Sequence, residues 1–165
     1  MRYISPELAG YSSFIIDPVI FKAHSSGKVS LNPSEAAEVA RYFNESLAGV
    51  LSSRGYQLTN QPGVGVGRVR IALTDVAESI WWLNLHPASR LSGVGTGGAA
   101  MEGEIIDSVS GEQLGAVIQA GKGSQFELDS FSKLDDVKDT INRWSDAAGK
   151  RLDELRAQRA AAGAR

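Results

Sequence analysis

The chain has 165 residues, 42% of them hydrophobic and 22% charged, which is typical of one globular domain, and no apolar run approaches the ~20 residues of a membrane-spanning helix. Its formal net charge of −2 disfavours nucleic-acid binding, because domains that bind DNA or RNA are usually basic. The chain contains no cysteine, which excludes disulfides and cysteine-ligated metals and leaves packing as the source of stability.

The first third of the chain predicts a strand followed by a long helix. Residues 11–17 are rich in aromatic and β-branched side chains and end at Pro18, which cannot donate a backbone hydrogen bond, so we expect a strand that stops there. Pro33 suits the first position of a helix, apolar residues then recur at steps of three and four, and Gly55 is a typical C-terminal stop. We therefore predict a helix over residues 33–54.

The middle of the chain predicts strands. A short strand is expected over residues 56–59, and residues 68–78 alternate apolar and polar side chains, as a strand with one buried face does. Residues 100–107 repeat this alternation, and a turn at Ser110-Gly111 leads into residues 113–120. The last two segments are predicted to form a β-hairpin.

A second amphipathic helix is predicted over residues 131–155, where apolar residues again step by three or four. Residues 156–165 are rich in alanine and lack an apolar stripe, so we expect a frayed tail behind a single domain of residues 1–155. These elements predict an α+β fold of two layers, with a mainly antiparallel sheet and both helices on one face. The predicted core residues are Val39, Phe43, Leu47, Leu73, Ile105, Ile141 and Trp144.

Neither the glycine-rich segments nor the histidines form a recognisable cofactor or metal site. Gly63, Gly65 and Gly67 precede a strand instead of opening a helix, so a turn is favoured over a phosphate-binding loop. His24 and His86 lie far apart and match no metal-binding spacing, and no nucleophile-elbow motif accompanies them. We therefore expect neither a cofactor nor a metal.

Four charged residues are expected on one face of the sheet. Arg68 and Arg70 share a face of one predicted strand, and Glu102 and Glu104 share a face of another. If the strands are neighbours, we favour solvated cross-strand ion pairs, each worth about 0.2–1 kcal/mol. A catalytic carboxylate would instead require a desolvating pocket around one carboxyl group. This face is a candidate surface for a binding partner.

The segment between two of the predicted strands is longer than most connections need, and it contains two adjacent tryptophans. Trp81, Trp82, Leu85 and His86 form a candidate apolar patch for a partner. The alternative, which we weigh equally, is that one or both rings fold back over a sheet edge. We name residues 81–98 the candidate binding loop. Asp75 and Asp107, near strand ends, are expected to bond the backbone of turns.

Several runs of residues resemble one known family. They are VRIALTD at residues 69–75, MEGEIIDS at residues 101–108 with Gly111-Glu112 after it, and a terminal helix that carries Trp144. Their order resembles the DUF3313 family, whose bacterial members are classed as lipoproteins, and the strand from Tyr11 to Pro18 is similar as well. The resemblance covers most of residues 10–155.

The resemblance implies a compartment but no mechanism. Members of the family are exported with a signal peptide and a lipid-bearing cysteine ahead of the folded domain, so we expect a periplasmic protein whose native precursor extends beyond Met1 and is lipid-anchored to the outer membrane. The membrane would be reached through that anchor alone. The family has no established activity or catalytic motif, so no catalytic residue can be transferred to this chain.

The leading functional hypothesis is a non-enzymatic envelope domain that binds an envelope protein or another envelope component. The alternative is an enzyme, such as a hydrolase, that uses Glu102 or Glu104 with His86 in a cleft. A third hypothesis is a structural domain that oligomerises, although the sequence does not predict an oligomeric state. A pocket around either carboxylate would favour the enzyme, whereas exposed tryptophans on the candidate binding loop would favour binding.

Overall fold

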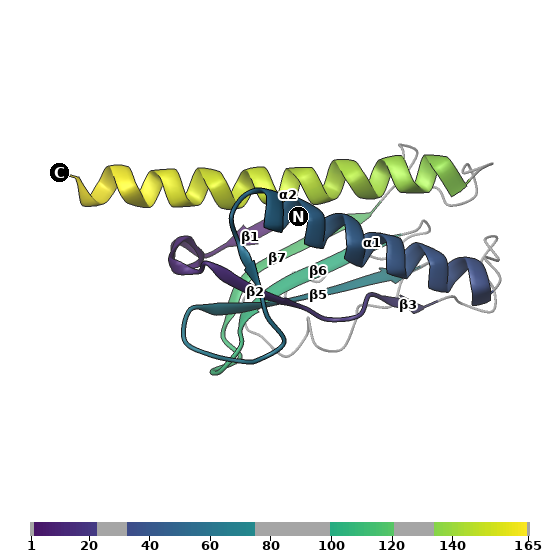
Figure 1. Ribbon diagram of the computed structural model, residues 1–165, viewed down its shortest axis with the longest axis horizontal. Coiled ribbons are helices and arrows are strands. Elements are labelled where there is room, and N and C mark those ends of the chain that lie inside the picture. Colours follow the sequence, from purple (N-terminus) through teal and green to yellow (C-terminus); the bar gives the residue numbers. More distant parts are fainter. Residues whose placement is uncertain (1, 23–32, 75–99, 121–133, 165) are drawn as a thin grey trace.

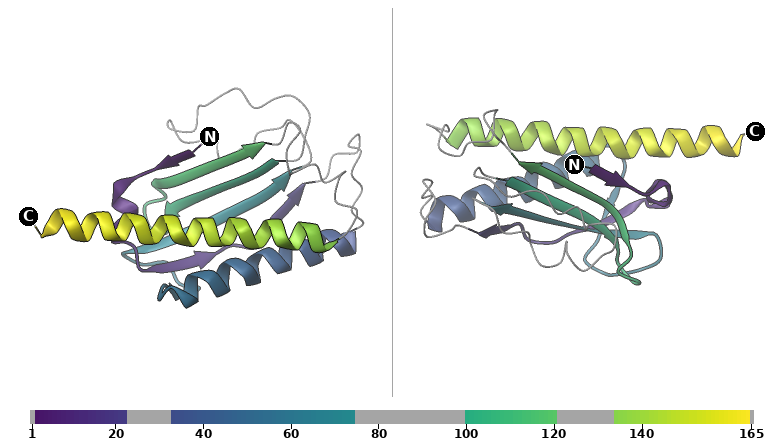
Figure 2. Two further views of the ribbon diagram at one scale, coloured as in Figure 1. Left: turned by 90° about the horizontal axis from the view of Figure 1, so that it is seen from above. Right: turned by 180° about the vertical axis from the view of Figure 1, so that it is seen from behind.

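The computed structural model describes residues 2–22, 33–74, 100–120 and 134–164. Within them, two long helices cover the same face of one sheet (Figure 1 and Figure 2). This is the two-layer α+β fold predicted from the sequence. In chain order the elements are β1 (Arg2–Ile4), the 3-10 helix η1 (Pro6–Gly10), β2 (Ser13–Ile16), β3 (Ile20–Lys22), α1 (Pro33–Ser53), β4 (Gln57–Leu58), β5 (Val66–Thr74), β6 (Ala100–Asp107), β7 (Gln113–Ala120) and α2 (Leu134–Gly163).

The sheet is mainly antiparallel. Its seven strands lie in the order β1-β7-β6-β5-β2-β4, and β3 pairs with β5 beyond the end of β2. Strands β5, β6, β7 and β1 alternate in direction, and β6 and β7 form the predicted hairpin. Strands β2 and β3 run parallel to β5, because α1 carries the chain back across the sheet between them.

A break at Pro18 separates β2 from β3. Ile16 lies opposite Val69 and Ile20 lies opposite Ala72, so three residues of one strand face two of the other. Proline has no backbone N–H, so it interrupts the ladder, and the extra residue is accommodated as a bulge. The predicted end of the first strand is confirmed.

Helix α1 follows its sequence signals closely. It begins at Pro33, has Glu35 in its first turn, and ends before Gly55, whose φ of 79° lies in the left-handed region that glycine adopts readily. Helix α2 differs from its prediction, because it continues through residues 156–163 in place of the frayed tail. Alanine is the strongest helix former, and Arg156 lies 4.1 Å over the Tyr56 ring, which ties this segment to the domain.

The two helices approach closely at Gly149. A Cβ atom there would lie 2.7 Å from a methyl carbon of Val50, closer than real contacts, so glycine is required. Just beyond α1, Arg54 donates to Asp146 and Asp153 of α2, with both N–O distances at 2.6 Å. These contacts hold α2 beside α1.

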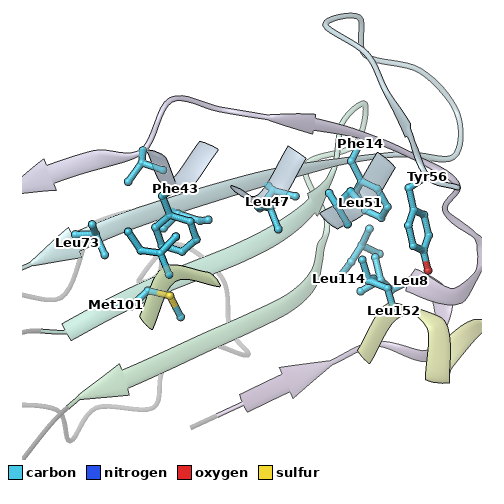
Figure 3. Packing of buried hydrophobic residues seen from close by; sticks show 14 of the residues in the cluster. Leu8, Phe14, Phe43, Leu47, Leu51, Tyr56, Leu73, Met101, Leu114 and Leu152 are labelled. Atoms are coloured by element: carbon cyan, nitrogen blue, oxygen red, sulfur yellow. The ribbon is translucent and has the colours of Figure 1, made fainter. Parts of the chain in front are cut away.

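The core lies between the helices and the sheet. Figure 3 shows Phe43 near Met101 at one end of the core, and Phe14 beside Tyr56 at the other. The Phe14 ring lies so close to Gly67 that a Cβ atom there would fall 2.7 Å from it, which explains the glycine at the start of β5. Of the predicted core residues, Ile105 and Trp144 are half-buried against this cluster, and the others are buried: Val39, Phe43, Leu47, Leu73 and Ile141.

Asp107 organises the turn of the β6–β7 hairpin, as predicted, whereas Asp75 lies outside the described residues. The Oδ1 atom of Asp107 accepts from the backbone N–H groups of Val109 and Ser110 at 2.9 and 2.7 Å, and its Oδ2 atom accepts from the Tyr11 hydroxyl at 2.8 Å. The Ser110 backbone bond and then the Tyr11 bond lower the pKa of Asp107 to about 2. Burial, followed by the bond to Asp107, raises the pKa of Tyr11 to about 12.

Phe43→Ala should lower the free energy of unfolding by roughly 3–5 kcal/mol, because the ring is 2% exposed and its removal leaves a cavity. Denaturant unfolding measures the loss. Glu45→Ala, at an exposed position of the same helix, is the control and should change stability by less than about 0.5 kcal/mol. An unchanged midpoint for Phe43→Ala would contradict the core assignment.

The Asp107 turn should make stability depend on pH at both extremes. A native carboxyl pKa lowered from 3.8 to about 2 stabilises the fold above pH 3.8, and this contribution is lost as the pH falls through 2. A phenol pKa raised from 10 to about 12 stabilises the fold below pH 10, and this contribution is lost as the pH rises through 12.

Asp107→Asn keeps an acceptor for the turn but cannot ionise, so its unfolding midpoint should vary less between pH 4 and pH 2 than that of the parent protein. Asp139→Asn, at an exposed position of α2, is the control. Identical acid dependence in the parent protein and Asp107→Asn would rule out the assigned role.

Candidate functional site

The candidate binding loop lies outside the described residues. This holds for Trp81, Trp82, Leu85 and His86, so both the tryptophan patch and the enzyme that would pair His86 with a glutamate stay predictions. The four charged residues of the sheet are described, and they occupy the face opposite the helices.

One of the predicted ion pairs forms. Arg70 lies directly opposite Glu104, and its guanidinium donates to the Glu104 carboxylate at 3.3 Å. The second oxygen of Glu104 accepts from Gln113 Nε2 at 3.0 Å. Arg68 lies instead opposite Ile106 in the register. Of the four charged residues on this face, Arg70 and Glu104 therefore form a cross-strand ion pair.

The carboxylates are buried, so the prediction of a solvated charged face is wrong. Glu102 and Glu104 are 4% and 2% exposed, and their neighbours on this face, Ile15, Ala72 and Ile106, are buried too. Strand alternation predicts which residues share a face, but it does not show whether that face reaches solvent. The Arg70–Glu104 pair thus joins a half-buried guanidinium to a buried carboxylate.

Asp17 joins the same cluster at its edge. One of its oxygens lies 3.5 Å from Arg70 Nε and 3.9 Å from Arg68. Because Glu104 is held by two donors, its arrangement suits a stable structural contact. Contact between these charged residues and a partner stays a prediction.

The structure adds a feature that the sequence reasoning missed, an apolar groove on the other face of the sheet. It has a volume of about 180 Å³ and lies between α2 and strands β1, β7 and β6. Figure 2 shows α2 beside α1 on this face, and neither of these two described helices lies over β7 and β1. Half-buried Ile4 of β1 and exposed Ala148 of α2 both contribute to its lining.

Small residues make room for the groove. Gly103 and Gly115 lie on its floor in β6 and β7, and Ala147 and Ala148 form the flank of α2. Larger side chains at these positions would reduce the space. Small residues at these four positions were the sequence signal, but they belong to three elements that adjoin only after folding.

The lining of the groove is suited to binding. Two of its described residues, Glu104 and Arg151, carry charge, but the Glu104 carboxylate lies on the opposite face of the sheet, where it is bonded to Arg70 and Gln113. Arg151 is exposed at the rim, where it pairs with Glu154 at 2.8 Å.

The described residues contain no group of three or more His, Cys, Asp or Glu that could hold a metal. None of the described helices is long and apolar enough to span a membrane.

Comparison with known proteins identifies a family but no close relative. The family model for "Protein of unknown function (DUF3313)" matches residues 1–148. Among curated proteins, none matches the chain significantly.

Several solved structures are similar at low identity. The PelC dodecamer from Paraburkholderia phytofirmans is 11% identical with a TM-score of 0.42, over 88% of this chain and 95% of that one. A DUF4136 family protein from Bacteroides thetaiotaomicron VPI-5482 is 11% identical with a TM-score of 0.47, over 92% and 95%. A candidate lipoprotein from Caulobacter crescentus CB15 is 12% identical with a TM-score of 0.33, over 93% of each chain.

Arg70→Met should destabilise the protein by about 3 kcal/mol, because it leaves the buried Glu104 without its cationic partner. Arg68→Met, on the same strand face, is the matched control and should cost less than about 1 kcal/mol, since its pair with Asp17 is longer and partly exposed. The double variant Arg70→Met with Glu104→Leu should recover part of the loss. Equal costs for the two arginine variants in denaturant unfolding would contradict a structural role for the pair.

Proposed function

The chain belongs to the DUF3313 family of proteins of unknown function, and we propose that it is a non-catalytic domain of the bacterial cell envelope that binds an envelope protein or another envelope component. The binding surface in this proposal is the groove between α2 and strands β1, β7 and β6. The native precursor is exported to the periplasm and lipid-anchored to the outer membrane, as the family resemblance implies.

The open groove is the observation that carries the proposal. Ligand pockets are usually concave and lined mainly by apolar side chains, and this groove has both properties. Here the floor is formed by strands and one wall by α2, so the surface is concave and largely preformed, as binding sites usually are. Its small side chains lose little conformational entropy when a ligand orders them.

Chemical reasons favour binding over catalysis at the described surfaces. The Glu104 carboxylate already accepts hydrogen bonds from Arg70 and Gln113, so a proton-transfer role would require breaking a buried network. The flank of α2 contributes alanines to the groove, which offer contact area and no reactive group. The candidate binding loop, with Trp81 and Trp82, is kept as a second surface that a partner would contact.

The proposal is tested with the full-length gene product in its native host. Growth with labelled palmitate followed by cell fractionation should give a labelled protein in the envelope. A crosslinking pull-down from those envelopes should recover a component with the parent protein and lose it with Ala148→Trp, which fills the groove from an exposed position. Ala160→Trp, exposed on the same helix outside the groove, is the control.

Thermal unfolding of each purified variant shows whether the domain stays folded, and Ala147→Phe provides a second way to fill the groove if Ala148→Trp does not. Undiminished recovery by a folded groove variant would overturn the assigned surface. Unlabelled protein in the cytosol would overturn the assigned location.

A further inference from the structure

We infer that the groove binds one acyl chain of an anionic amphiphile, with the chain on the apolar floor and the carboxylate at Arg151. The inference deepens the proposed function, because it rests on the groove as the binding surface and names the class of ligand.

The volume of the groove suits a narrow apolar ligand. An engineered apolar cavity of about 150 Å³ takes up benzene, and the groove holds about 180 Å³. Pockets for drug-sized ligands are usually about 300–1,000 Å³, so this groove suits a smaller or narrower ligand.

The shape of the groove suits a chain. Its wall on α2 extends from Trp144 to Arg151, a rise of about 11 Å along the helix axis. The floor crosses β6 and β7 at Gly103 and Gly115, beside the side chains of Val117 and Ile4. Ile4 contributes the β1 side of the lining. A flexible acyl chain can adjust its shape to a lining of this kind.

Charge at the rim selects the head group. Arg151 is the exposed cation of the described lining, because the carboxylate of Glu104 lies on the opposite face of the sheet with Arg70 and Gln113. The present partner of Arg151 is Glu154, one turn away on the surface, and exposed pairs of this kind contribute little stability. A ligand carboxylate can therefore take the place of Glu154 and accept two hydrogen bonds from the guanidinium.

The test uses cis-parinaric acid, a fatty acid that becomes fluorescent in apolar surroundings, followed by its displacement with dodecanoate or dodecanol. The purified protein should bind the probe at one saturable site, and both competitors should displace it. Arg151→Gln should weaken dodecanoate binding by about tenfold, because a charge-assisted bond is lost, and should change dodecanol binding by less than about twofold.

Two controls keep the test specific. Lys150→Gln removes the adjacent exposed charge of α2 and should bind dodecanoate like the parent protein. Ala148→Trp should abolish probe binding, whereas Ala160→Trp should retain it. Absence of saturable binding by the parent protein, or binding that survives in folded Ala148→Trp, would overturn the inference, as would equal weakening of both competitors by Arg151→Gln.

The outcomes for the ligand and for the proposed function are separable. Loss of an envelope protein in the Ala148→Trp pull-down, without probe binding by the parent protein, would overturn the acyl chain and retain the groove as a protein-binding surface. Probe binding that Ala148→Trp abolishes, together with an unchanged pull-down, would support the acyl chain and overturn the proposed partner surface.

Discussion

The close approach of the two helices at Gly149 determines how the sheet is covered. A Cβ atom on Gly149 would lie 2.7 Å from a methyl carbon of Val50, so its absence lets the axis of α2 lie near α1. The bonds from Arg54 to Asp146 and Asp153 keep the helix there. Among the described residues, a helix in this position lies over the β5 side of the sheet and not over β7 and β1. The groove lies along the flank of this helix.

The two faces of the sheet solve different physical problems. The face beneath the helices excludes water by packing apolar side chains, whereas the opposite face buries Glu102 and Glu104. Burial of a carboxylate is costly unless donors surround it, and Glu104 has Arg70 and Gln113. A polar layer of this kind favours one strand register over its neighbours, because a shift of one residue would separate Arg70 from Glu104.

Sequence reasoning predicted the fold well where a local pattern has one physical meaning. The period of Phe43 and Leu47 indicates a buried helix face, and Pro18 and Gly55 end their elements for backbone reasons that no tertiary contact changes. The burial of Glu104 was not predictable, because alternating glutamates also occur on solvated strands. The candidate site was missed for a related reason, since Gly103 and Ala148 adjoin only once α2 is docked.

The shortness of β1 bears on how the groove behaves in time. This strand forms one side of the groove, yet it joins the sheet through three residue pairs with β7, at an edge. Local unfolding free energies are lowest where few hydrogen bonds hold a segment, so β1 detaches at less cost than the hairpin beside it. If the groove binds the proposed acyl chain, transient release of β1 would widen it while the core stays intact. Ligand entry and exit would then follow the opening equilibrium of this strand, and slower amide exchange in β1 would report occupancy of the groove.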